Sequence, residues 1–69
     1  MLPQATEFVK DYDKRTALVK SQIRTLSSCT DDDQKKMLEY WISNNRRWLL
    51  EREQKYTICK EIINVSRED

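Results

Sequence analysis

The chain has 69 residues, the length of one small domain or of a piece of a larger protein. Its formal net charge of +1 gives no global electrostatic reason to bind nucleic acid or an anionic membrane. It has no histidine and two cysteines, which excludes a four-ligand zinc site within one chain and any nucleophile that relies on a histidine base. Glycine is absent and proline occurs once. Because tight β-turns need residues with positive φ, this composition favours long helices joined by a single connection.

No signal peptide is predicted, since the N-terminal stretch lacks an apolar core, and no apolar run approaches the length of a membrane span. We therefore expect an intracellular protein, cytoplasmic or nuclear. The carboxylates show no pattern that indicates a pocket able to raise their pKa values. We accordingly expect no enzymatic activity, and assign no catalytic residue, metal ligand, cofactor or small-molecule substrate.

A first helix is predicted over about residues 3–27, with Pro3 in its first turn, where a missing N–H costs nothing. The three- and four-residue spacing of a heptad recurs along it. The residues with this spacing are Leu2, Ala5, Val9, Tyr12, Thr16, Val19, Ile23 and Leu26.

The pattern breaks at a predicted turn, residues 28–30, before a second helix over about residues 31–66. Thr30 followed by Asp33 resembles a capping box with Asp in place of Glu. Asp31, Asp32 and Asp33 would lie in the first turn, where negative charge complements the helix dipole. We interpret this acidic triplet as a helix start rather than a metal site.

The apolar stripe of the second helix is wider than a two-stranded seam requires, because two tryptophans flank a central apolar column. If the helices pack antiparallel, Ile23 faces Leu38, and Tyr12 faces Trp48 or Leu49. The same alignment sets Val19 opposite Trp41 or Ile42, and Thr16 opposite Asn45 as a polar layer that holds the register. The predicted fold is therefore all-α, an antiparallel two-helix hairpin, coiled-coil-like, forming a single domain over 1–69.

The second helix is predicted to overhang the first. At about 1.5 Å per residue the helices span roughly 36 Å and 50 Å, which leaves residues beyond about Thr57 without cover. We expect a second chain to cover them, so that two hairpins form a four-helix bundle as a homodimer, or that helices of another protein do so. The expected partner-binding residues are Trp41, Trp48, Arg52, Tyr56, Ile58, Cys59, Ile62 and Ile63. The competing interpretation is that the helix ends early, from Ile58 onward.

One residue of this set has two alternative roles. Arg52 occupies an apparent core position, from which its guanidinium reaches either a carboxylate at the rim of the same chain or an acidic group of a partner. Cys59 is too far along the helix from Cys29 for an intrachain disulfide, so both are expected to be free thiols.

A helical nucleic-acid-binding protein is the alternative function. Its contacts would be Lys35, Lys36, Arg46 and Arg47. This hypothesis predicts steeply salt-dependent binding that Arg46→Glu plus Arg47→Glu abolishes without unfolding the domain. The interaction hypothesis predicts that these arginine changes do little.

Overall fold

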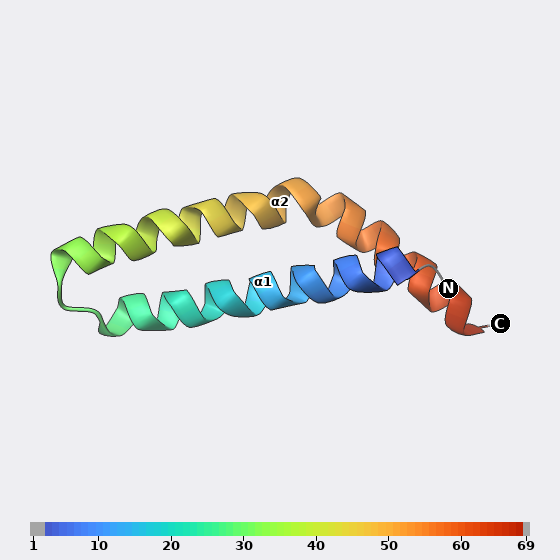
Figure 1. Cartoon of the computed structure of the whole chain (residues 1–69), viewed down its shortest axis with the longest axis horizontal. Coiled ribbons are helices and arrows are strands. Elements are labelled where there is room, and N and C mark those ends of the chain that lie inside the picture. Colours follow the sequence, from blue (N-terminus) through green and yellow to red (C-terminus); the bar gives the residue numbers. More distant parts are fainter. Residues whose placement is uncertain (1–2, 69) are drawn as a thin grey trace.

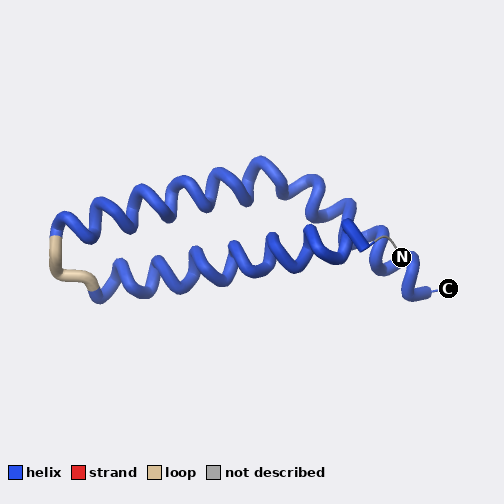
Figure 2. Tube along the Cα trace, in the orientation of Figure 1, coloured by secondary structure: helices blue, strands red, loops and turns tan. Residues whose placement is uncertain are grey.

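The computed structural model describes residues 3–68, which fold into two α-helices packed side by side. Helix α1 spans Pro3–Ser28 and helix α2 spans Asp32–Glu68, with a three-residue loop between them (Figures 1 and 2). The molecule is a rod with principal extents of 53 × 19 × 14 Å. The predicted all-α hairpin is confirmed. Within the described residues, neither helix contains a stretch long and apolar enough to cross a membrane.

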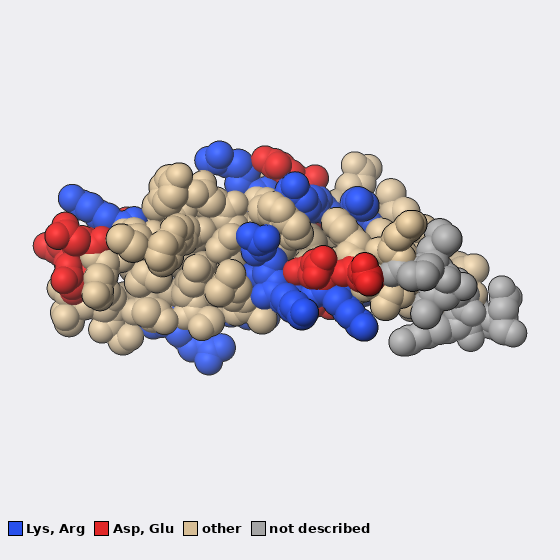
Figure 3. Space-filling model, viewed as in Figure 1, with Lys and Arg blue, Asp and Glu red and all other residues tan. Residues whose placement is uncertain are grey.

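Helix α2 begins at a cap one residue later than predicted. The Asp31 side chain accepts hydrogen bonds from the backbone N–H groups of Asp33 at 2.9 Å and Gln34 at 3.3 Å, while its carbonyl accepts the N–H of Lys35. The prediction of Thr30 as the cap is wrong, because the Asp31 carboxylate satisfies the same donors and adds charge at the positive end of the helix dipole. Asp32 and Asp33 follow in the first turn, as predicted. These acidic residues gather at the loop end of the hairpin (Figure 3).

The core of the hairpin is narrow. Over residues 4–65, four hydrophobic side chains are buried, and their positions run along most of the seam between the helices: Ala5, Val19, Ile42 and Cys59. Leu2, the first member of the predicted seam, lies outside the described residues. Because so few side chains are shielded, burial within one hairpin provides only a small hydrophobic driving force for a chain of this length.

The open end of the hairpin closes further along α2 than straight rods would allow. Helix α2 bends, so that its C-terminal turns run toward the start of α1 and continue past it (Figure 1). Cys59 is only 7% exposed, as buried as Ala5, and Ile63 lines a hollow with Thr6 and Val9 of α1. The prediction that residues beyond Thr57 have nothing on α1 to contact is therefore wrong for Cys59 and Ile63. The alternative that the helix ends near Ile58 is also wrong, since α2 continues to Glu68.

A polar layer crosses the middle of the hairpin around Asn45. Its side-chain carbonyl accepts a hydrogen bond from Arg15 Nη1 at 2.9 Å, and its amide donates to Gln22 Oε1 at 3.1 Å. Thr16, the predicted partner, instead donates its hydroxyl to the carbonyl of Tyr12 one turn earlier. A threonine hydroxyl is easily satisfied within its own helix, whereas an amide needs both an acceptor and a donor across the seam. The layer exists, but with different partners.

Candidate interaction surface

Four aromatic side chains join the helices in the half of the hairpin away from the loop. This aromatic cluster consists of Phe8, Tyr12, Trp48 and Tyr56. The Tyr12 ring stacks on Tyr56 at 4.0 Å between centroids and lies 6.2 Å from Trp48, tilted by 39°. The predicted pairing of Tyr12 with Trp48 is confirmed. The stack with Tyr56, two turns further along α2, was not predicted, because it depends on how α2 bends.

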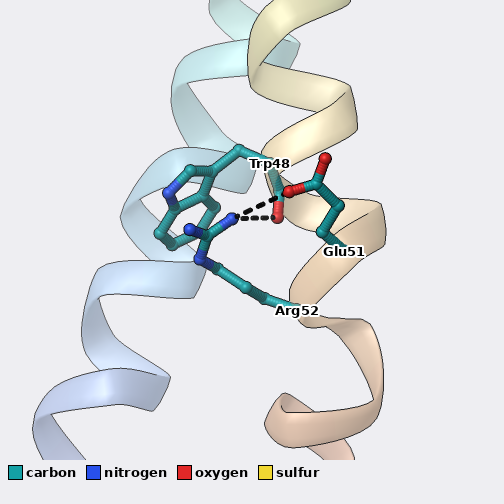
Figure 4. A network of polar contacts seen from close by, with 3 residues as sticks. All are labelled: Trp48, Glu51 and Arg52. Atoms are coloured by element: carbon teal, nitrogen blue, oxygen red, sulfur yellow. Dashed lines mark hydrogen bonds and ion pairs between the residues drawn. The ribbon is translucent and has the colours of Figure 1, made fainter.

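Trp48 lies under two guanidinium groups. The Cζ atoms of Arg15 from α1 and Arg52 from α2 lie 4.5 Å and 4.4 Å from its ring centroid. Arg52 Nη1 also donates to the Trp48 carbonyl at 3.2 Å and forms an ion pair with Glu51 at 3.7 Å (Figure 4). Of the two roles considered for Arg52, the structure shows the contact to a carboxylate of the same chain. Cation–π contacts of this kind hold both the tryptophan and the arginines within one hairpin.

Two lysines cover the remaining aromatic faces of the cluster. Lys55 Nζ lies 4.5 Å from the Phe8 centroid, and Lys60 Nζ lies 5.2 Å from that of Tyr56. On the face shown in Figure 3, basic side chains gather over the middle of the hairpin, next to acidic ones. Sequence reasoning missed this role for the lysines. For Lys55 the sequence did contain a signal, because this residue lies at seven-residue spacing on the flank of α2 that carries Trp41 and Trp48.

Tyr56 is held at the seam by a carboxylate as well as by the stack. Its hydroxyl donates a hydrogen bond of 2.7 Å to Asp13 Oδ1. This hydrogen bond, followed by desolvation and by the negative charge of Asp13, raises the pKa of Tyr56 above its ordinary value of 10.0. Ionised Tyr56 would lose the bond and face the carboxylate, so the contact requires the protonated phenol.

This raised pKa makes one contribution to stability depend on pH. The folded chain holds the Tyr56 proton more tightly than the unfolded chain, so the contribution is complete below pH 10.0 and is lost as the pH rises through the raised pKa. We expect wild type to lose more free energy of unfolding than Tyr56→Phe between about pH 8 and about pH 11, measured by urea denaturation. The control is Tyr40→Phe, since Tyr40 is 66% exposed. Equal losses for wild type and Tyr56→Phe would contradict the assignment.

The structure divides the predicted partner-binding residues into two groups. Contacts within the hairpin occupy the first group: Trp48, Arg52, Tyr56, Cys59 and Ile63. The second group faces outward: Trp41 is 47% exposed and Ile58 is 50% exposed, while the half-buried Ile62 lines a surface hollow with Ile58 and Val65. The thiols of Cys29 and Cys59 are both free.

Large apolar side chains are exposed along both helices. Eight residues form this exposed apolar set: Leu18, Ile23, Met37, Tyr40, Trp41, Leu50, Ile58 and Val65. Leu50 is the most exposed of them, at 71%. Sequence reasoning did not select Leu50, Met37 or Tyr40, because each lies away from the seven-residue columns that define the seam. The expectation of an overhang placed the uncovered surface at the C-terminal end of α2, whereas the structure distributes it along the whole rod.

One member of the exposed apolar set, Ile23, lines a groove between the two helices near the loop. Ile23 and Leu26 of α1 form one wall of this groove, and Ile42 of α2 forms the other. The rest of the lining consists of three polar residues of α2: Glu39, Ser43 and Arg46. Ile23 is 41% exposed, although the heptad places it in the seam, because no side chain covers it here.

The basic residues of the alternative function lie on the loop half of α2. Lys36, Arg46 and Arg47 are exposed, and Lys35 is half-buried. Arg46 lines the same groove as Ile23. Trp48 is the member of the aromatic cluster nearest to Arg46 and Arg47 in the sequence, and its ring already contacts the guanidinium groups of Arg15 and Arg52.

Comparison with protein-family models, with curated proteins and with solved structures finds no match to this chain.

Proposed function

We propose that the protein is a non-enzymatic interaction module that assembles through the exposed apolar surface of its helices. The assembly we favour is a homodimer of hairpins, in which four helices share one core. Such a module acts by presenting or occupying a helical surface, as an adaptor, a scaffold segment or a small inhibitor does. The alternative occupant is a pair of helices from another protein.

The observation that supports this proposal is the ratio between the exposed and the buried apolar side chains. In the part of the chain whose side chains the structure describes, eight large hydrophobic residues are exposed, whereas the buried core consists of four hydrophobic residues, two of which are small. Covering a side chain of this type stabilises a protein by roughly 1.5–3 kcal/mol. A second helical surface over part of the exposed apolar set would therefore add a hydrophobic contribution to that of the intrachain core.

Contacts inside the hairpin leave the exposed apolar set free for such an assembly. The aromatic cluster and the Asn45 layer hold α1 against α2 without using Trp41, Leu50 or Ile58. Changing these exposed residues should consequently alter assembly and leave the hairpin intact.

Sedimentation equilibrium of the full chain tests the proposal. Wild type is expected to self-associate, and the triple variant Trp41→Gln, Leu50→Gln, Ile58→Gln to sediment as a monomer with unchanged helical circular dichroism. Glutamine retains helix propensity, so the variant removes apolar surface alone. Thr57→Gln, an exposed position of the same helix, is the control. A wild-type chain that stays monomeric, with a free energy of unfolding independent of protein concentration, would contradict self-assembly.

A further inference from the structure

The groove near the loop has charged residues of opposite sign along one rim. Glu39 and Arg46 both line it from α2, one on each side of Ser43. Seven residues apart, they lie two turns from each other on the same side of the helix. Both are exposed, and the one ion pair within the described residues joins Arg52 to Glu51. The hairpin therefore presents a carboxylate and a guanidinium beside an apolar groove, neither of them in an ion pair.

We propose that this groove is where a second copy of the chain docks, with its α2 antiparallel to the first; this inference rests on the proposed function. A two-fold axis close to Ser43 brings Glu39 of each copy opposite Arg46 of the other, which forms two ion pairs. The small Ser43 side chain at the axis lets the two helices approach closely. A parallel arrangement would instead oppose like charges at both positions, so Glu39 and Arg46 favour the antiparallel one.

The apolar part of the groove fits the same arrangement. A helix seated between α1 and α2 covers Ile23, which the hairpin alone leaves 41% exposed. Leu50 lies one turn beyond Arg46 on the same flank of α2 and is 71% exposed. In the two-fold pair Leu50 extends toward the loop end of the partner's groove. An isologous contact of this kind makes the four-helix bundle, with the two α2 helices adjacent at its centre.

The same flank of α2 is a poorer contact for a second copy further from the loop. Leu50 and Ile58 border a hollow there whose charged lining residues are Glu53 and Glu61. Two copies packed on this stretch would bring carboxylates together without a cation from the same lining, which disfavours self-association. The groove, by contrast, provides one charge of each sign.

Charge reversal tests the arrangement by sedimentation equilibrium of the full chain. Because Arg46 lines the groove, its charge reversal is now expected to weaken assembly, in contrast to the sequence-based expectation that it does little. We expect Glu39→Arg and Arg46→Glu each to raise the dimer dissociation constant at least about tenfold, because each creates two like-charge contacts per dimer. The double variant Glu39→Arg, Arg46→Glu should restore the wild-type constant to within about threefold, since both ion pairs reform with their polarity exchanged. Arg47→Glu is the matched control, because it makes the same charge change beside Arg46 at an exposed position outside the groove.

Three outcomes would overturn this inference. Single variants that dimerise as wild type does would show that the groove is not the contact, while the proposed function stands if the triple glutamine variant is monomeric. A double variant no better than the singles would exclude the Glu39–Arg46 pairing. A monomeric wild type would exclude a second copy altogether. Circular dichroism of each variant separates loss of assembly from loss of fold.

Discussion

Replacing Ile42 by alanine is expected to remove about 2–5 kcal/mol from the free energy of unfolding. Ile42 is 7% exposed and lies in the seam between the loop and the Asn45 layer, so its truncation leaves a cavity between two helices that have few other buried contacts. A domain of this size rarely has more than about 3–5 kcal/mol of stability from its core. We therefore expect much of the Ile42→Ala variant to be unfolded at 25 °C, measured by circular dichroism and urea denaturation.

The control for this change is Ile58→Ala. Ile58 is the same residue type in the same helix but is 50% exposed, so its truncation should cost less than about 1 kcal/mol. Both measurements belong at protein concentrations below those that support self-association, because assembly adds to the apparent stability. Equal costs for the two isoleucines would contradict the position of the seam.

Replacing Trp48 by alanine should have the second largest effect, a loss of about 2–3 kcal/mol. The change removes the ring that Arg15 and Arg52 contact and that Tyr12 packs against, so it breaks contacts between the helices as well as within α2. The free energy of unfolding from urea titrations is the measurement.

Trp41→Ala is the matched control for Trp48→Ala. Trp41 lies one heptad earlier on the same flank of α2 and is 47% exposed, with no aromatic or cation–π contact to Trp48 or to Arg15. Its loss should lower hairpin stability by less than about 1 kcal/mol and act mainly on assembly. A Trp41→Ala variant as unstable as Trp48→Ala would show that the two flank positions are equivalent.

The two helices and their antiparallel packing were predictable because the evidence for them is local. Heptad spacing can be recognised within a few turns, and the lack of glycine leaves few ways to fold other than as long helices. The buried positions Ala5, Val19 and Ile42 all belong to the predicted seam. The cap was misplaced by one residue because Thr30 and Asp31 are both good N-cap residues, and only the backbone geometry distinguishes them.

The length of the seam was not predictable from the number of residues in each helix and the rise per residue. Treating both helices as straight left the end of α2 uncovered, whereas its bend lets Cys59 lie buried against α1. The buried side chains of Ala5 and Cys59 are both small, and the stack of Tyr12 on Tyr56 holds the helices together one turn earlier than Cys59. Such an effect depends on several side chains acting together, and residue spacing alone does not contain it.

The short loop has a consequence for the order in which the hairpin forms. Contacts next to Asp31 close only a few residues, whereas the bond between Tyr56 and Asp13 joins residues 43 positions apart. Because the entropy cost of closing a segment grows with its length, pairing should start beside the loop and proceed toward the aromatic cluster. The stack of Tyr12 on Tyr56 then forms late in folding. Its strength should therefore change the rate of unfolding rather than the rate of folding.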